Sequence, residues 1–470
     1  MTVLGRLRRK LWAWQLSRVS PQTLQALSHR ALLAAFRRTL AQVPAYQELF
    51  AATGHAAREV TEVASFQRLA PLLEKDNTFQ RFPLDRLTVP GVLTELASVL
   101  TSSGQGGRFA FGLSTHAMAR RATEDIEFAL QLNFGVDDRR TLLINCLPMG
   151  VHFAAGNCTV ADVSVREDMA LALLEKFRAQ YEQFILVADP LFLKRLLDEA
   201  RRRGFSFAGM RTHLVLGEET FGENFRSYVA RALHMDPEAE NHALLASSMG
   251  VGELGLNVFF ETRAGIRLRR RAFREPALRA ALLGRETPPE AVPLVFSYNP
   301  LQFFVEAVSP GSDGFGRLAV STLSRQAPLP LLRYLTGDVV RVVEPALLSS
   351  WADRSRAPEA FPLPVVLIRG READVVTAST HLSEVKDALY RDPELADQLS
   401  GAFRLTRGAC TLDVQLQKFA TATAEGLTAP LNALFAALLP GFSVRAWPYA
   451  QFPHGLELDY ERKFKYLTAG

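Results

Sequence analysis

The sequence predicts an α/β protein with a large N-terminal domain of β-α layers, a β-rich subdomain within it, and a small α+β domain at the C-terminal end. Three observations lead to this prediction. The 470 residues exceed the size at which a single hydrophobic core stops growing, so more than one domain is expected. From about residue 95, short β-rich runs alternate with helical stretches, which is typical of β-α units around a largely parallel sheet. From about residue 290, strands and turn signals follow one another, which indicates an antiparallel or mixed region.

Residues 1–50 are predicted to be helical, because apolar side chains recur at helical spacing from Leu24 to Leu40 and Val43-Pro44 ends the pattern. The first 16 residues combine basic and apolar side chains, and we expect a packed or solvated amphipathic helix there rather than a membrane anchor. No other apolar run reaches the ~18 residues that a membrane span requires. The predicted β-α units follow as the strands TLLINCLP, FILVADP and THLVLGEE, with the helical stretches REDMALALLEKFRAQYEQF, LFLKRLLDEARRRG and ENFRSYVARAL.

The β-rich region contains the runs FFVEAV, RLAVSTLS and GDVVRVVE. Three prolines, Pro358, Pro362 and Pro364, then precede the segment LIRGREADVV, and we expect a domain boundary near Arg369-Gly370. The predicted domains are therefore residues 1–370 and residues 371–470.

The composition excludes several classes of protein. With 48% hydrophobic and 22% charged residues, the chain is an ordinary globular protein. A net charge of +5 spread over this length does not suggest a nucleic-acid partner. The three cysteines, Cys146, Cys158 and Cys410, lack C-x-x-C spacing, so we expect neither a disulfide framework nor a cysteine-built zinc site, and we expect a cytoplasmic location.

The clearest local feature is the glycine-rich segment Thr101 to Arg108, TSSGQGGR. Glycines let backbone N–H groups approach an anion closely, hydroxyl groups donate further hydrogen bonds, and Arg108 adds a positive charge. Such a loop suits phosphate groups. A flexible turn is the alternative, because the segment lacks the Gly-Lys-Ser/Thr ending of the P-loop NTPases.

Five further segments follow in a definite order, and each is a weak signal alone. Two of them end predicted strands, one lies in the β-rich region, one marks the expected boundary, and the last is close to the C-terminus. These segments are Gly217-Glu218-Glu219-Thr220, Met249-Gly250-Val251-Gly252-Glu253, Arg333-Tyr334-Leu335-Thr336-Gly337-Asp338, Gly370-Arg371 and Arg462-Lys463-Phe464-Lys465.

In this order the segments resemble those of the adenylate-forming superfamily of acyl-CoA synthetases, and within it the phenylacetate-CoA ligase group. The run TSSGQGGRFAFGLST resembles the group's A-S-S-G-T-T-G-K-P-T, Tyr334 to Asp338 resembles Y-R-T-G-D, and Met249 to Glu253 resembles Y-G-L-S-E. The runs VPAYQELF and LAPLLEKD resemble two further segments of the group. The resemblance implies an ATP- and magnesium-dependent enzyme whose small C-terminal domain is mobile.

Residue roles follow from the resemblance alone. It implies that Ser102, Ser103, Gly104, Gly106 and Gly107 hold the ATP phosphates, with Arg108 in place of the usual lysine. It implies that Gly217, Glu218, Glu219, Met249 and Gly250 border the adenine, that Asp338 and Arg371 hold the ribose, and that Glu253 binds Mg²⁺. The catalytic lysine would be Lys463, with Lys465 as its rival. The acid pocket would include Met149, Gly150, His152 and Ser248, although a structural role for His152 is favoured.

Several positions depart from the family pattern. Gln105 and Gly106 replace two threonines of the phosphate loop, Phe109 replaces a proline, and Met249 replaces the tyrosine that would stack on adenine. In the hinge, Ala373 replaces an aspartate and the following glycine is missing. The cysteines and histidine with which some relatives bind zinc are also missing, so no zinc is expected.

The expected function is activation of a carboxylic acid, with an aromatic acid favoured, to an acyl-AMP that is then transferred to CoA. Because the hinge departures concern this transfer more than the activation step, an amine or a carrier-protein thiol stays open as the acceptor. A non-catalytic member of the family is the remaining alternative. The expected partners are a small carboxylic acid and, as a further candidate, an acyl carrier protein, with no nucleic acid and no membrane.

Overall fold

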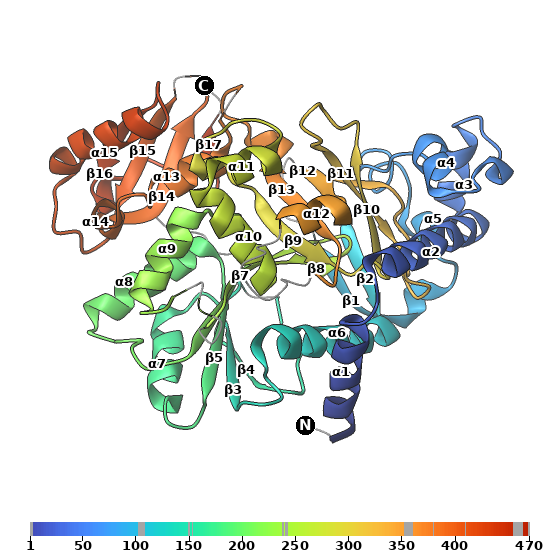
Figure 1. Ribbon diagram of the computed structural model, residues 1–470, viewed down its shortest axis with the longest axis horizontal. Helices are drawn as coiled ribbons and strands as arrows, with labels where there is room; N and C mark the ends of the chain where they lie inside the picture. The colour runs from blue at the N-terminus through green and yellow to red at the C-terminus, as the bar shows by residue number, and fades with distance from the viewer. Residues whose placement is uncertain are drawn as a thin grey trace. The chain divides into compact units, whose positions relative to one another are not determined.

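The computed structural model describes residues 3–101, 109–148, 151–152, 154–236, 239, 243–351, 361–378, 380–408, 410–454 and 464–468. The chain divides into two compact units, each built from three separate segments. Figure 1 shows the helices and strands with their labels, coloured from the N-terminus to the C-terminus. Unit 1 contains residues 1–132, 248–268 and 295–369, and unit 2 contains residues 133–247, 269–294 and 370–470.

Unit 1 begins with helices and continues into a hairpin and an antiparallel region. Its helices are α1 (Val3–Leu16), α2 (Pro21–Gln42), α3 (Pro44–Ala51), α4 (Val63–Leu69), α5 (Leu84–Leu87), α6 (His116–Phe134) and α12 (Pro345–Trp351). Its strands are β1 (Leu96–Thr101), β2 (Phe111–Thr115), β8 (Gly255–Phe260), β9 (Leu294–Tyr298), β10 (Phe303–Val308), β11 (Gly316–Thr322), β12 (Tyr334–Val343) and β13 (Val365–Arg371). The boundaries between the two units fall inside five elements: α6, β9, β13, β7 (Leu245–Val251) and α10 (Arg263–Arg274).

The strands of unit 1 lie in the order β10-β11-β12-β13-β9-β8-β7, and the pairs β10/β11, β11/β12, β8/β9 and β7/β8 are antiparallel. The predicted antiparallel region is therefore confirmed. The core of this unit lies between helices α2 to α4 and the strands, where Phe36 packs edge to face against Tyr46, Phe50 and Phe66. The separate hairpin of β1 and β2 is formed by the strands that precede and follow the glycine-rich segment in the sequence.

Unit 2 contains the predicted β-α units. Its parallel strands follow the order β7-β6-β5-β3-β4. The strands are β3 (Thr141–Asn145), β4 (Thr159–Asp162), β5 (Gln183–Ala188) and β6 (Thr212–Leu216), and the helices are α7 (Glu167–Phe177), α8 (Pro190–Arg202), α9 (Glu223–Ala232) and α11 (Pro276–Leu283). Every residue of β3 and β5 is buried, as expected for strands covered on both faces.

The C-terminal segment of unit 2 has its own core and a mixed sheet. The sheet order is β16-β15-β14-β17, with β14/β15 antiparallel and β15/β16 and β14/β17 parallel. The elements are α13 (Leu382–Ala388), α14 (Pro393–Gln398), β14 (Leu399–Thr406), β15 (Thr411–Leu416), α15 (Ala424–Leu438), β16 (Ser443–Trp447) and β17 (Leu467–Thr468). The α/β class, with a distinct α+β part at the C-terminal end, is thus confirmed.

Local sequence explains most of these boundaries. Residues 1–50 form three helices, because Val43 ends α2 in an extended conformation and Pro44 starts α3 at the first position, which tolerates proline well. Helix α8 begins in the same way at Pro190, with the Asp189 side chain accepting hydrogen bonds from the backbone of Leu191 and Phe192. The boundary near Arg369-Gly370 coincides with a change of unit, but residues from 370 belong to unit 2 together with residues 133–247 and 269–294. That residues 371–470 move separately stays a prediction.

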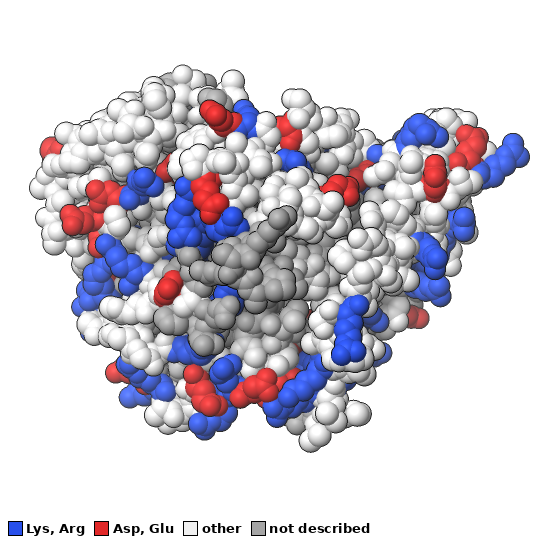
Figure 2. Space-filling model, in the orientation of Figure 1, with Lys and Arg blue, Asp and Glu red and all other residues white. Residues whose placement is uncertain are grey.

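Lys and Arg side chains are interspersed with Asp and Glu side chains over the face shown in Figure 2. Among the described residues, no helix is long and apolar enough to cross a membrane.

Candidate active site

The glycine-rich segment is held at both ends by a hairpin. Thr101, the last residue of β1, pairs with Phe111, the first residue of β2. Ser102, Ser103, Gly104, Gly106, Gly107 and Arg108 lie outside the described residues. The structure describes the two ends of the segment, at Thr101 and before Phe111.

The strand that leaves this segment touches the turn that carries Glu253. A Cβ atom built on Gly112 would lie 2.1 Å from the carbonyl oxygen of Gly252. Only glycine at position 112 allows this approach, because any side chain would displace the backbone of the turn. Two predicted site segments that are far apart in the sequence are therefore in direct backbone contact within unit 1.

Glu253 is a buried acid with a basic neighbour. Its side chain is 4% exposed, and Lys75 Nζ lies 3.1 Å from Oε1. The ammonium group is within ion-pairing distance, yet no group among the described residues makes a well-aligned hydrogen bond to this oxygen. The negative charge of Glu253, after burial, also raises the pKa of the Tyr334 hydroxyl.

Lys75 and Tyr334 come from two segments that are joined by backbone hydrogen bonds. The N–H of Leu73 donates to the carbonyl of Arg333 (3.1 Å), and the N–H of Leu335 donates to the carbonyl of Leu73 (2.9 Å). Three segments therefore meet at one place in unit 1. They are the segment that contains Lys75, the segment that begins at Tyr334, and the turn that ends at Glu253.

Asp338 lies near the middle of β12 and is 5% exposed. The Thr336 hydroxyl donates a hydrogen bond to Asp338 Oδ2 (2.7 Å), and the Asp338 N–H donates to Thr336 Oγ1 (3.3 Å). Gly337 between them has φ 84°, a left-handed conformation that favours glycine. The T-G-D sequence thus forms a local bend that orients the carboxylate.

The other predicted residues of unit 1 lie in the β7/β8 hairpin. Met249 pairs with Phe259 across the hairpin, and Gly250 follows it in β7. The Ser248 hydroxyl donates to Asn257 Oδ1 (2.8 Å). These three residues belong to the strand that leads directly to Glu253.

In unit 2, Gly217 to Glu219 form a tight turn after β6. The N–H of Glu219 donates to the carbonyl of Gly217 (2.7 Å), and Glu218 between them has φ 65°. A three-residue turn with a positive φ at a non-glycine residue is rare and strained, and such strain is concentrated at functional sites.

Two residues of the C-terminal segment hold the Glu219 side chain. Lys386 Nζ donates to Oε2 (2.7 Å), and the Tyr466 hydroxyl donates to the same oxygen (3.0 Å). The Lys386 ammonium also lies 3.7 Å from the centre of the Tyr466 ring. Burial and the Glu219 charge raise the pKa of Tyr466, so the hydroxyl remains a donor. A small cavity adjoins this group, with Leu191, Phe225, Tyr390 and Phe403 in its walls.

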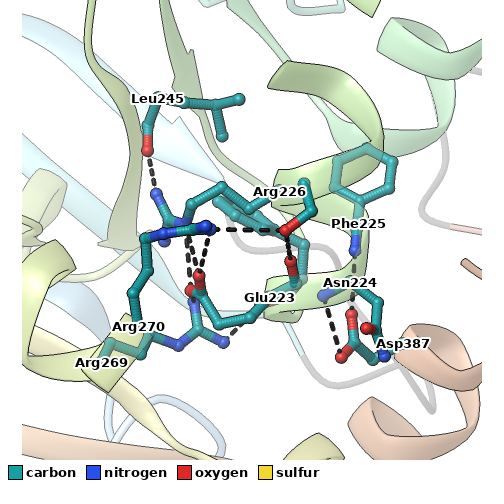
Figure 3. Close-up of polar contacts among 10 residues, drawn as sticks. Glu223, Asn224, Phe225, Arg226, Leu245, Arg269, Arg270 and Asp387 are labelled. Carbon is teal, nitrogen blue, oxygen red and sulfur yellow. Dashed lines mark hydrogen bonds and ion pairs between the residues drawn. The ribbon is translucent and has the colours of Figure 1, made fainter. Parts of the chain in front are cut away.

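Helix α9, which follows this turn, starts on a buried ionic cluster (Figure 3). Glu223 pairs with Arg226 Nε at 2.9 Å, Arg269 Nη1 at 3.3 Å and Arg270 Nη1 at 3.2 Å, and its side chain is 1% exposed. Arg226 and Arg269 also donate to the carbonyls of Leu245 and Phe221. A buried acid with three guanidinium partners is fully compensated, so this cluster has a structural role.

The N-terminus of α9 is capped by a residue from another helix. Gly222 occupies the cap position and has no side chain, and a Cβ there would lie 2.1 Å from Cγ of Asp387. Asp387, from α13, instead accepts hydrogen bonds from the N–H groups of Asn224 (3.2 Å) and Phe225 (3.1 Å) (Figure 3). Burial raises the pKa of the Asp387 carboxyl to about 7, although the two N–H groups and the Arg269 charge oppose this shift.

The remaining predicted residues are less clearly connected. Arg371 ends β13, and His381 Nε2 lies 3.0 Å from its carbonyl oxygen. The His152 side chain is 76% exposed, and its Nδ1 lies 3.3 Å from Asp162 Oδ2. Lys465 is exposed. Lys463, Met149 and Gly150 lie outside the described residues.

Four residues near these groups had no predicted role: Lys75, Tyr334, Lys386 and Asp387. Lys75 and Tyr334 lie in two segments that resemble the family, LAPLLEKD and Tyr334 to Asp338. Their position in these segments could therefore have suggested a role in the site. Lys386 and Asp387 lie in an ordinary amphipathic stretch, and their role depends on partners far away in the sequence.

Comparison with known proteins identifies the fold. No protein-family model and no curated protein matches the sequence. Similar solved structures include 2-hydroxyisobutyryl-CoA ligase in the postadenylation state with R3-HIB-AMP, with 14% identity and a TM-score of 0.66 over 97% of this chain and 91% of that one. The same ligase with 2-HIB-AMP and CoA in the thioesterification state gives 14% identity and a TM-score of 0.55 over 96% and 91%. The chain therefore has the α/β fold of the adenylate-forming ligases.

Proposed function

We propose that the protein uses ATP and Mg²⁺ to activate a carboxylic acid as an acyl-AMP and then transfers the acyl group to CoA. In the first step a carboxylate oxygen attacks the α-phosphorus of ATP and pyrophosphate leaves. In the second step the CoA thiolate attacks the acyl carbon and AMP leaves. The fold supports this proposal, because 2-hydroxyisobutyryl-CoA ligase has been solved with an acyl-AMP and with CoA.

The observation that carries the proposal is the contact between Gly112 and Gly252. It brings the strand that leaves the glycine-rich segment against the turn that ends at Glu253. This contact supports the proposal that a cation bound by Glu253 and the phosphates bound by that segment are neighbours. Attack of one anion on another requires such a cation and N–H donors close to the developing charge.

The residues around Glu253 fit a magnesium ion. Its buried carboxylate has an oxygen without a well-aligned hydrogen bond, and Mg²⁺ prefers oxygen ligands. Among the described residues there is no group of three metal-ligating side chains, so phosphate and water oxygens would complete the coordination, as is usual for Mg²⁺ at nucleotide sites. Lys75 would then neutralise Glu253 when no metal is bound.

The other roles follow the family resemblance. We propose that Ser102 to Arg108 bind the phosphates, that Gly217 to Glu219 and Met249 border the adenine, and that Asp338 and Arg371 hold the ribose. Lys463 would bridge the acid and the α-phosphate. The buried and oriented carboxylate of Asp338 agrees with a ribose contact, since it accepts a hydrogen bond from Thr336 and keeps further acceptor capacity as a carboxylate.

The acid and the acceptor need a direct test. Purified protein with ATP and Mg²⁺ should release pyrophosphate only when a suitable acid is present, and the screen should cover aryl, arylacetic, fatty, amino and short hydroxy acids. The Glu253→Gln variant should lower the rate at least ~100-fold, because it removes charge stabilisation of the transition state. Glu74→Gln is the matched control, since Glu74 is a half-exposed acid next to Lys75 that pairs with Arg317, and its rate should stay within ~2-fold.

Each acceptor is then supplied in turn. Formation of an acyl-CoA supports the proposal, whereas acid-dependent pyrophosphate release with transfer only to an amine or a carrier-protein thiol would replace the CoA part. No release with any acid would favour a non-catalytic member of the family.

A further inference from the structure

Helix α1 exposes a continuous apolar face. Leu4, Leu7, Leu11 and Trp14 are 78%, 60%, 50% and 51% exposed, respectively. Their spacing of three or four residues brings them to one side of the helix over its whole length. Single exposed leucines are common on protein surfaces, but four large apolar side chains in a row along one helix are not.

The opposite side of α1 and the edge that carries Arg8 attach the helix to α6. Arg9 Nη1 lies 2.6 Å from Glu127 Oε2, with both side chains nearly buried, and Arg8 pairs with Glu124 at 2.9 Å. Trp12 packs edge to face against Phe128. In Figure 1 the two helices lie next to each other. A surface helix normally buries its apolar side, so α1 is inverted, with a buried arginine and exposed leucines.

The N-terminal residues that surround this face contribute charge of one sign, although Glu124 of α6 pairs with Arg8 at its edge. Residues 1–47 contain no acidic residue, and Glu48 is the first. The same stretch has eight basic residues: Arg6, Arg8, Arg9, Lys10, Arg18, Arg30, Arg37 and Arg38. Lys10 and Arg8 are exposed on the two edges of the apolar face, and the Arg18 guanidinium lies 4.1 Å from the centre of the Trp14 ring.

We propose that α1 docks this protein on an anionic lipid surface, with Leu4, Leu7, Leu11 and Trp14 at the boundary between headgroups and acyl chains. An exposed leucine stripe with a tryptophan and basic edges is the pattern of helices that lie in the membrane interface. The basic edges favour anionic headgroups over a neutral surface. This differs from the expectation that residues 1–16 form a packed or solvated helix and that no membrane takes part, because the sequence alone does not reveal which side of the helix the fold covers.

The test is co-sedimentation of the full chain with vesicles of phosphatidylcholine alone and of phosphatidylcholine mixed with phosphatidylglycerol. Binding to the anionic vesicles should be at least ~10-fold tighter than to the neutral ones and should weaken as salt is raised. The double variant Leu7→Gln/Leu11→Gln keeps residues of good helix propensity and should weaken binding at least ~10-fold.

Leu27→Gln/Leu132→Gln is the matched control, because these leucines are 42% and 40% exposed on α2 and α6 of the same unit. This control should bind within ~2-fold of the unchanged protein. Circular dichroism of all variants shows whether the fold is retained, and vesicle binding needs no substrate, so its outcome is independent of the proposed enzymatic activity.

Two results would overturn the proposal: a failure of the unchanged protein to bind anionic vesicles, and equal binding by Leu7→Gln/Leu11→Gln. If vesicle binding is absent and analytical ultracentrifugation shows a concentration-dependent dimer that this variant abolishes, the face is assigned to a second copy of the chain.

Discussion

At the scale of single residues, the ion pair between Glu253 and Lys75 connects the stability of unit 1 with the Mg²⁺ binding that we propose for Glu253. The acid is almost completely buried, whereas Lys75 is about one-third exposed, at 35%. A buried carboxylate without a counter-charge is costly, so each of the two cations, Lys75 and the proposed Mg²⁺, can reduce this cost. We therefore expect the two cations to substitute for one another in part.

This leads to a prediction for Lys75→Met. In the absence of metal the variant should unfold at a lower temperature than the unchanged protein, corresponding to roughly 1–2 kcal/mol once the exposure of Lys75 is considered. Addition of Mg²⁺ should stabilise the variant more than it stabilises the unchanged protein. Thermal unfolding with and without Mg²⁺ measures both effects. Lys176→Met, at an exposed lysine of α7, is the control, and an equal Mg²⁺ effect in all three proteins would refute the link.

At the scale of elements, Asp387 of α13 caps helix α9, and the raised pKa of its carboxyl predicts that the free energy of unfolding depends on pH. The pKa of Asp387 is raised from 3.8 to about 7, first by burial and then by the Glu223 charge. Below pH 4 both the folded and the unfolded chain carry the proton. Between pH 4 and 7 the folded state still binds it while the unfolded state has released it, so this contribution to the free energy of unfolding falls as pH rises.

We therefore expect Asp387→Asn to reduce the loss of stability between pH 5 and 7 by about 2–3 kcal/mol, since an amide does not titrate there. Urea unfolding of both proteins across this range gives the two slopes. Burial also raises the pKa of Asp189, the cap of α8, to about 6, so part of the slope should remain in the variant. Parallel pH profiles for the two proteins would show that Asp387 does not titrate as its surroundings suggest.

Most elements were predictable from the sequence because their signals are local. The runs that became β5, α8, β6 and α9 carry their own periodicity and, at Asp189-Pro190, their own cap. The cap of α9 was not predictable, because Gly222 occupies the position where a capping side chain would be recognised and the acceptor comes from Asp387. The exposed side of α1 was not predictable either, since an amphipathic pattern does not reveal which side faces the protein.

The same distinction holds for the candidate site. Glu253 and Asp338 could be proposed from the sequence because each lies in a short segment with a recognisable order of residues. Glu253 pairs with Lys75, and Glu219 pairs with Lys386. In both pairs the two residues come from chain segments that meet only after folding, so no local sequence pattern predicts the contact.

At the scale of the whole molecule, the C-terminal segment is bound to the turn that is expected to border the adenine. Glu219 accepts hydrogen bonds from Lys386 and Tyr466, and Asp387 caps the helix that follows the turn. All of these residues belong to unit 2. If residues 371–470 rotate between the two half-reactions, as the resemblance implies, the rotation must break these contacts and form them again.

The two half-reactions can be separated through the C-terminal lysines. We expect Lys463→Ala to slow acid-dependent pyrophosphate release at least ~100-fold, because the lysine would offset charge as the carboxylate meets the α-phosphate. Transfer to CoA from a chemically prepared acyl-AMP should change less than ~5-fold, since that step begins after pyrophosphate has left. Lys465→Ala is the matched control, with the same loss of charge two residues away, and it should leave both rates nearly unchanged. A larger effect of Lys465→Ala would exchange the roles of the two lysines, and an equal loss in both half-reactions would mean that Lys463 maintains the fold of the segment instead of taking part in the first step.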